Sequence, residues 1–243
     1  MSARVIWCAF MLFACVSQAE TPDEIFSKAG AAFAKQEYGE AAYGLRALSA
    51  GNNWSHGAQH NLGIVEWRVA RPGPAVLAWE RAHALDPFDR NTIANLRFAR
   101  SKANLVEPER LWFERYSEWL PAPAWLGAAS LGLWGGVLLL VMPRLFGTRR
   151  ADWHQGVAAL LLAAFLLTTP AMMGLYTRGN AGVVIEEEAS LRLTPTTEGE
   201  PLAKLQGGEL ARIERERGDY LYIRAEGDRA GWVKRAEFEK IWP

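Results

Sequence analysis

The sequence is poor in reactive and metal-binding side chains. It has only two cysteines, Cys8 and Cys15, and four histidines in 243 residues. Lys and Arg together number 27, as do Asp and Glu, so the chain lacks the basic excess that favours nucleic acid or anionic lipid. It also lacks a phosphate-binding glycine loop, a nucleophile elbow and a metal-ligand cluster of usable spacing. We therefore expect no nucleic-acid partner, no cofactor, no metal and no enzymatic activity.

The first 19 residues have the pattern of a secretory signal peptide. Arg4 gives a short basic region, an apolar stretch runs from Val5 to Val16, and Ala19 ends a small-residue cleavage site. The apolar stretch is shorter than the roughly 20 residues that span a bilayer, and an uncleaved anchor is the alternative. Cleavage after Ala19 removes both cysteines, which excludes a disulfide, a thiolate metal site and a cysteine nucleophile in the mature chain.

Two long apolar runs set this chain apart from a small soluble protein. Residues 119–143 and 155–177 contain no charged side chain. As helices, each run would cover about 30 Å or more at 1.5 Å per residue. A buried hairpin of a soluble protein is the alternative, but it would not need such long uncharged runs. We predict transmembrane helices at residues 121–143 and 155–177.

The connection between these runs, residues 144–154, indicates the orientation of the hairpin. It contains Arg144, Arg149 and Arg150, and short arginine-rich loops stay on the cytoplasmic side of the membrane. We therefore predict a cytoplasmic loop in a bacterial inner membrane. Residues 20–118 and 178–243 would then lie together in the periplasm.

Aromatic side chains gather before the first apolar run, as is typical of the interface between membrane and water. They are Trp112, Tyr116, Trp119 and Trp125. We expect residues 106–120 to form an amphipathic interfacial linker.

Small residues recur every four positions in the first run, at Ala128, Gly132 and Gly136, and the second run offers Ala159 and Ala163. Such stripes let helix backbones approach closely. We expect the two helices to pack on each other, and a separate membrane partner is the alternative.

Residues 22–87 repeat with a period of 34, which pairs Ala29 with Gly63, Ala41 with Ala75 and Leu45 with Trp79. The second copy resembles the tetratricopeptide (TPR) family. The residues that carry this resemblance are Leu62, Gly63, Ala75, Trp79, Ala82 and Pro87. It implies antiparallel helix pairs over residues 20–105, and a concave groove that binds peptides or partner helices. By register, the groove would be lined by Phe33, His60, Ile64 and Trp67, although Phe33 and Trp67 could instead be core residues.

Local signals refine this helical region. The segment Arg71-Pro72-Gly73-Pro74 predicts a break between two helices, and Asp89 is suited to cap a third helix that runs to about Asn104. His56 and His60 are four residues apart and could share a helix face, but no acidic residue close in sequence completes a metal site. Two repeats and a capping helix are near the minimum for a continuous core.

After the apolar runs the hydrophobic period changes to two, as in Leu210-Ala211-Arg212-Ile213, and glycine-containing turns follow at Gly207-Gly208, Gly218-Asp219 and Gly227-Asp228. Short strands with tight turns predict a small all-β barrel over residues 181–243. The segments Leu191-Arg192-Leu193-Thr194-Pro195 and Gly231-Trp232-Val233 resemble two signatures of bacterial SH3 domains. An aromatic ligand shelf would consist of Pro195, Tyr220, Tyr222 and Trp232, with Trp232 as a core residue in the alternative.

The fold class expected is thus a multidomain membrane protein with an all-α TPR repeat, a two-helix transmembrane hairpin and an SH3-like barrel. This order of modules resembles BatE-type proteins of the aerotolerance operon. The resemblance implies a non-enzymatic scaffold that works beside a MoxR-type ATPase and membrane proteins with von Willebrand A domains.

Two other functions compete with the scaffold. The first is a protein that binds or senses cell-wall peptidoglycan peptides through the SH3-like domain. The second is a membrane enzyme, which the absence of ionisable residues within the apolar runs disfavours.

Overall fold

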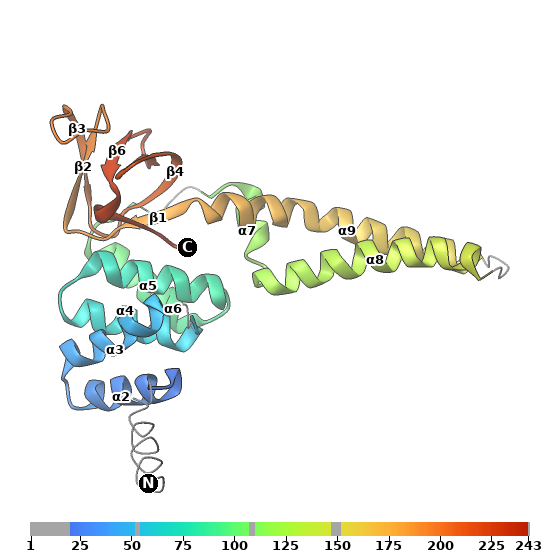
Figure 1. Cartoon of the computed structure of the whole chain (residues 1–243), viewed down its shortest axis with the longest axis horizontal. Coiled ribbons are helices and arrows are strands. Elements are labelled where there is room, and N and C mark those ends of the chain that lie inside the picture. The colour runs from blue at the N-terminus through green and yellow to red at the C-terminus, as the bar shows by residue number, and fades with distance from the viewer. Residues whose placement is uncertain (1–19, 52–53, 107–109, 147–151, 243) are drawn as a thin grey trace, which may run out of the picture. The chain divides into compact units, whose positions relative to one another are not determined.

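A computed structural model describes residues 20–51, 54–106, 110–146 and 152–242. The expected signal peptide lies outside these ranges, as do Arg149 and Arg150 of the expected cytoplasmic loop. The chain forms two compact units, the first ending at Asn53 and the second beginning at Trp54. Along the chain, helices come first, two long apolar helices follow, and strands come last (Figure 1). The predicted order of a helical region, two apolar helices and a small β-domain is confirmed.

The first unit contains helices α2 (Pro22–Ala34) and α3 (Tyr38–Ala50). Thr21 begins α2 with a capping box, in which its hydroxyl accepts from the Glu24 amide and the Glu24 carboxylate accepts from the Thr21 amide. Small side chains make the contact between the two helices, because a Cβ at Gly44 would lie only 3.3 Å from Ala29 Cβ. The pair is thus held by close backbone approach.

The second unit begins with helices α4 (His56–Arg68), α5 (Pro72–Leu85) and α6 (Arg90–Lys102). The predicted break between α4 and α5 is confirmed, since Pro72 opens α5 after a three-residue turn. Asp89 is the N-cap of α6, as predicted, and α6 ends two residues before Asn104. Gly63 of α4 faces Trp79 of α5, whose side chain is buried.

The 34-residue period predicted from sequence is also the period of the helices. α2, α4 and α6 begin at residues 22, 56 and 90, which are 34 apart, and each has 13 residues. Their N-caps are Thr21, Ser55 and Asp89, and each of these side chains accepts a hydrogen bond from a first-turn amide. The N-cap residues therefore repeat with the same 34-residue period as the apolar residues.

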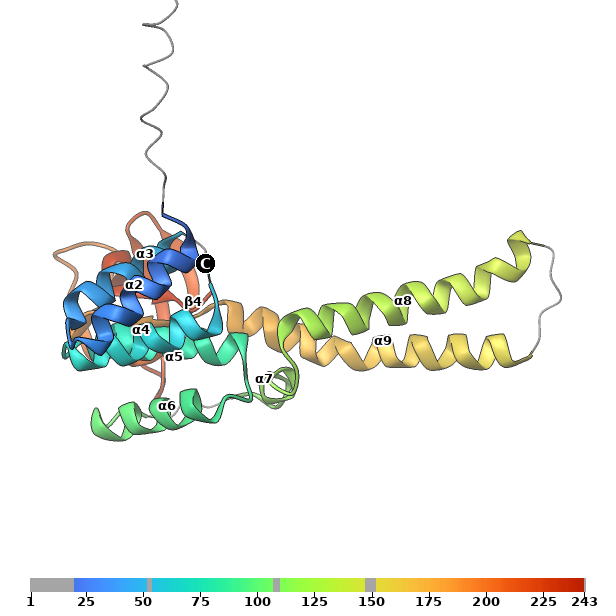
Figure 2. The same cartoon turned by 90° about the horizontal axis from the view of Figure 1, so that it is seen from below.

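Two helices of the second unit, α8 (Ala122–Leu145) and α9 (Asp152–Gly179), form a hairpin in which they lie side by side (Figures 1 and 2). The stretches Ala122–Pro143 and Trp153–Gly179 are long and apolar enough to cross a membrane. A Cβ at Gly132 would lie 2.9 Å from the Leu161 carbonyl oxygen, and one at Gly136 would lie 2.7 Å from Leu162 Cγ. The expected packing of the two helices on each other is confirmed.

The small residue that α9 contributes to this contact differs from the expected ones. Ala158 is buried beneath Gly136, whereas Ala159 and Ala163 are exposed. The stripe on α8 is likewise shorter than expected, since Ala128 is exposed. The four-residue spacing thus identified Gly132 and Gly136 of α8 correctly. On α9 it predicted Ala159, whereas the residue in contact is its neighbour Ala158.

The expected linker contains a short helix, α7 (Trp112–Ser117). It packs on the C-terminal half of α9, where the Tyr116 hydroxyl donates to the Leu167 carbonyl at 3.1 Å. The Trp125 indole N–H donates to the Ser117 carbonyl at 3.0 Å, and this indole is buried rather than interfacial. Trp112 and Trp119 are exposed, as an interfacial residue would be.

In the described chain seven strands form one antiparallel sheet of order β3-β2-β6-β5-β4-β1-β7. They are β1 (Ala181–Val184), β2 (Glu188–Arg192), β3 (Pro201–Gln206), β4 (Leu210–Arg217), β5 (Tyr220–Ala225), β6 (Ala230–Lys234) and β7 (Phe238–Lys240). All three predicted turns are confirmed, and their glycines Gly208, Gly218 and Gly227 have positive φ. Gly231 lies in close packing, because a Cβ there would lie 3.0 Å from the Arg192 carbonyl oxygen.

The sheet and the helices of the second unit share a core. Residues Ala75, Val76 and Trp79 of α5 belong to the same buried cluster as Val183 of β1 and Ile241. Polar contacts reinforce this junction around Arg81 of α5, a buried residue. Its guanidinium donates to the Ile241 carbonyl at 3.1 Å, the Lys240 carbonyl at 2.8 Å and the Glu239 carboxylate at 2.7 Å. The helices and the β-domain are therefore not independent modules here.

Candidate functional site

One face of α4 carries three of the four residues expected to line a groove. His56, His60, Ile64 and Trp67 recur every three or four positions, so they form a single stripe along the helix. This stripe faces α6: its first half is polar and its second half is apolar.

The apolar half is packed rather than open. Ile64 and Trp67 are half-buried against the cluster that contains Leu96 and Ala99 of α6. The Trp67 ring lies 6.1 Å from the Trp79 ring and 5.5 Å from the Phe98 ring, between centroids. Most of the contact surface of these residues is thus used within the fold.

Phe33, the fourth expected groove residue, belongs to the first unit and is 37% exposed. Its ring meets the Tyr38 ring edge-on at a centroid distance of 5.6 Å. The structure brings His60, Ile64 and Trp67 together on α4, and Phe33 is placed only within its own unit.

Phe98 of α6 is the exposed apolar residue next to this stripe. It follows Ile64 by one period of 34 residues, but it is 48% exposed whereas Ile64 is half-buried. The Lys102 ammonium lies 6.0 Å from the Phe98 ring centroid, and Arg90 and Arg97 are exposed on the same helix. Within its bounds α6 contains no acidic residue, so the charged side chains that this helix contributes beside Phe98 are basic.

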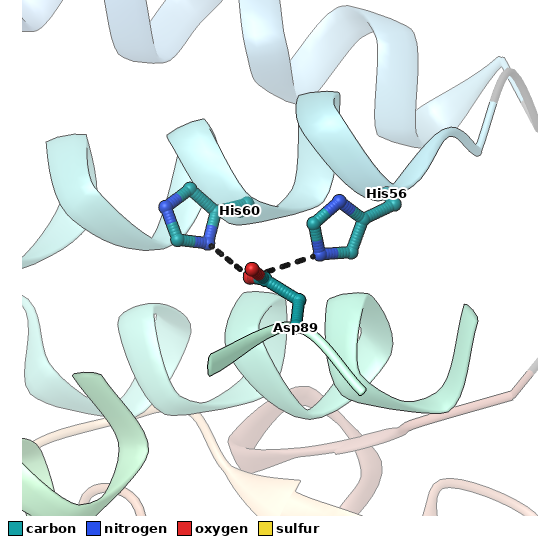
Figure 3. A group of neighbouring side chains, drawn as sticks. All are labelled: His56, His60 and Asp89. Carbon is teal, nitrogen blue, oxygen red and sulfur yellow. Dashed lines mark ion pairs between the residues drawn. The ribbon is translucent and has the colours of Figure 1, made fainter. Parts of the chain in front are cut away.

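The polar half of the stripe meets the N-terminus of α6 (Figure 3). His56 Nε2 lies 3.3 Å from Asp89 Oδ2, and His60 Nδ1 lies 3.7 Å from the same oxygen. Thr92 joins the group, with its hydroxyl 2.7 Å from His60 Nδ1 and 2.6 Å from Asp89 Oδ2. Both imidazole rings point toward one carboxylate, although that carboxylate is distant in sequence.

Capping explains the electrostatics of this group. The Asp89 carboxylate accepts from the Thr92 hydroxyl and from the Thr92 and Asn91 amides, and these bonds lower the pKa of Asp89 to about 2. Burial lowers the pKa of His60, although the Asp89 charge opposes that shift. At neutral pH the group therefore pairs an ionised carboxylate with a neutral imidazole.

The expected aromatic shelf of the β-domain is partly assembled. Tyr222 and Trp232 are paired across β5 and β6, with ring centroids 5.3 Å apart, and the Arg215 guanidinium lies 4.9 Å from the Tyr222 centroid. Tyr220 is two residues from Tyr222 and lies on the same face of the strand. Pro195 lies in the turn that follows β2 and is half-buried. Trp232 is likewise half-buried, so it is not a fully enclosed core residue.

A cavity of about 750 Å³ lies between α5, α7, the end of α9 and the sheet. Its charged side chains include ion pairs. Glu114 of α7, which is buried, accepts from Arg212 of β4 at 2.7 Å, and Arg110 pairs with Glu118. The Glu114–Arg212 pair joins elements that are far apart in sequence, so we regard the cavity as part of the junction rather than as the candidate site.

Comparisons with protein families, curated proteins and solved structures found no match.

Sequence reasoning missed two residues of this site, Asp89 as the partner of the histidines and Phe98 as the exposed aromatic. The 34-residue period contained the signal for both. Asp89 follows the N-cap Ser55 by one period and Phe98 follows Ile64 by one period, so extending the repeat into α6 would have placed them beside α4.

Proposed function

We propose that this chain is a non-enzymatic, membrane-anchored adaptor that binds a protein partner through its helical repeat. A TPR-like repeat before the hairpin and an SH3-like domain after it would both lie in the periplasm of a bacterium. The arginine-containing loop between two helices that could cross a membrane supports this topology.

The observation that carries the proposal is the exposure of Phe98. In the preceding repeat the equivalent residue, Ile64, is covered by a buried cluster that includes Leu96 and Ala99 of α6. The next described helix after α6 is the six-residue α7, which packs on α9 instead. Phe98 therefore presents the surface on which a further repeat would dock, and a partner helix could take that place.

The surface around Phe98 also indicates the chemistry of the partner. Lys102 lies beside Phe98, and Arg90 and Arg97 are exposed on the same helix, so the complementary segment would carry an apolar side chain together with Asp or Glu. The order of modules resembles BatE-type proteins. Membrane proteins with von Willebrand A domains are therefore the first partners to test, and a MoxR-type ATPase system the second.

The test compares two phenylalanines of the same region. Phe98→Glu removes the apolar centre of the proposed surface and sets a negative charge against the acidic residues proposed for the partner, which typically costs several kcal/mol of binding free energy. Phe88→Glu makes the same change at a side chain that is 64% exposed, in the turn before α6. The full-length protein, purified from membranes in mild detergent, should keep its von Willebrand A domain partner with Phe88→Glu and lose it with Phe98→Glu. Equal recovery with both variants would contradict the proposal.

Cell-wall binding through the β-domain is the second candidate function, and the pairing of Tyr222 with Trp232 favours it. If it is correct, Tyr222→Ala and Trp232→Ala should abolish co-sedimentation with purified sacculi, and Phe98→Glu should leave it intact. Deleting residues 181–243 is not a suitable control, because it would expose the core that α5 shares with β1.

A further inference from the structure

We propose that His56, His60 and Asp89 form a binding site for a divalent transition-metal ion of the Zn²⁺ class, which fastens α4 to the start of α6. The site is separate from the Phe98 surface and does not depend on the adaptor function. It uses three protein ligands and leaves one coordination position for water.

The donor set suits such an ion. Two imidazole nitrogens and one carboxylate oxygen are ligands that Zn²⁺ accepts, and histidines four residues apart on a helix present their rings to one side. The three ligand atoms all lie within 4.8 Å of one another. In a tetrahedral site with metal–ligand bonds of about 2.0–2.2 Å, ligand atoms are about 3.4 Å apart.

The observed distances are close to that requirement. The separation of 3.3 Å between His56 Nε2 and Asp89 Oδ2 already matches it, and the 3.7 Å from His60 Nδ1 exceeds it slightly. Side-chain rotations of the two histidines can bring the nitrogens to an ion beside Asp89 Oδ2 (Figure 3). Both rings already point at the carboxylate.

The surroundings hold the carboxylate in place. Asp89 Oδ2 accepts from the Thr92 amide at 2.9 Å and from the Thr92 hydroxyl at 2.6 Å, while Oδ1 accepts from the Asn91 amide at 3.3 Å. Such outer hydrogen bonds orient a ligating carboxylate. Each carboxylate oxygen has two lone pairs, so an ion on Oδ2 would replace the hydrogen bond from the Thr92 hydroxyl, while the hydrogen bonds from the Asn91 and Thr92 amides would keep the cap.

A hydrogen-bonded group without metal is the competing explanation. In that state the Thr92 hydroxyl donates to Asp89 and accepts from His60 Nδ1, which must then carry a hydrogen. Metal binding instead requires the lone pair of His60 Nδ1. The hydrogen of the neutral ring would therefore move to Nε2, so this ring need not release a proton overall.

The experiment is calorimetric titration of the full-length, untagged protein in mild detergent with Zn²⁺ alone. We expect saturable binding of one ion per chain, weakened at least about 10-fold by His56→Gln and by His60→Gln. His154→Gln is the matched control, since His154 lies in α9 outside the group, and it should bind as the unaltered protein does. Circular dichroism checks that each variant keeps its helices.

A second measurement separates a built site from surface carboxylates. Hydrogen exchange with and without Zn²⁺ should show slower exchange at the start of α6, and this change should disappear in His56→Gln. The inference is overturned if the unaltered protein shows no one-to-one binding, if both variants bind as tightly as it does, or if His154→Gln weakens binding equally.

Discussion

Gly63 is the position at which the packing of the helical repeat can be tested most directly. A Cβ added there would lie 2.7 Å from Cε2 of Trp79 and still closer to two other atoms of the indole. Trp79 is 2% exposed, and the cluster around it joins α5 to α6 and to the β-domain. The ring cannot move aside without disturbing that cluster.

The magnitude follows from two opposing effects. Overpacking a dense core costs about 1–3 kcal/mol, whereas replacing a glycine within a helix gains up to about 1 kcal/mol. For Gly63→Ala the gain in helix propensity nearly cancels the overpacking cost, if that cost is at the lower end of its range. For Gly63→Leu, which adds three more carbon atoms, the clash dominates, and we expect a net loss of about 2 kcal/mol in the local opening free energy.

Hydrogen exchange of the full-length protein in detergent measures this loss region by region. Peptides from α4 and α5 of Gly63→Leu should exchange about 30-fold faster, since 1.4 kcal/mol corresponds to a factor of ten. Gly30→Ala in α2 is the control: a Cβ there meets nothing within 4 Å, so exchange in α2 should stay the same or slow. Unchanged exchange of α4 and α5 in Gly63→Leu would show that Gly63 does not face Trp79.

Three further predictions concern the junction, the hairpin and the sheet. Arg81→Ala should speed hydrogen exchange of β7 by the equivalent of about 1–3 kcal/mol, because buried carbonyls lose their donor. Exchange in Arg81→Lys should lie between that of the unaltered protein and that of Arg81→Ala. Unchanged exchange of β7 in Arg81→Ala would contradict the contact between Arg81 and the last strand. Gly132→Leu should lower the midpoint of thermal denaturation in detergent, because its Cβ meets the α9 backbone, whereas Gly156→Leu, with open space around it, should not; equal midpoints would contradict the packing. Hydrogen bonds from Arg235 and Lys240 lower the pKa of Glu216 to about 2, so this carboxylate stabilises the sheet above pH 4 and loses that effect as the pH falls toward 2. Glu216→Gln should therefore lower the melting temperature slightly at pH 7, because it removes less than about 1 kcal/mol from the free energy of unfolding when the charged partners are exposed. The difference in melting temperature between the variant and the unaltered protein should shrink toward pH 2. A difference that does not vary with pH would contradict this prediction.

Local features of the fold could be predicted from the sequence because their causes are local. Caps, turn glycines and the proline break depend on a few neighbouring residues, and the structure has them at Asp89, Gly218 and Pro72. The uncharged runs required only composition, and the period of 34 required only internal comparison. Each of these signals can be recognised without knowing what the segment packs against.

The long-range contacts could not be predicted in the same way. The core that Val76 shares with Val183, and the hydrogen bonds from Arg81 to the last strand, join segments more than 100 residues apart. Nothing in the local pattern distinguishes an alanine-rich helix that meets a second helix from one that also meets a sheet. The half-burial of Ile64 and Trp67 could not be predicted for the same reason, since it depends on the packing of α6 against them.

The adaptor proposal is tested most directly by cross-linking in living cells. A photo-cross-linking amino acid at position 98, in the full-length membrane-inserted protein, should form an adduct with one membrane protein, and the contacted segment should contain Asp or Glu beside an apolar residue. The same amino acid at position 88 serves as the control and should give no such adduct. Adducts from position 232 with peptidoglycan, together with none from position 98, would contradict the adaptor and favour the wall-binding function.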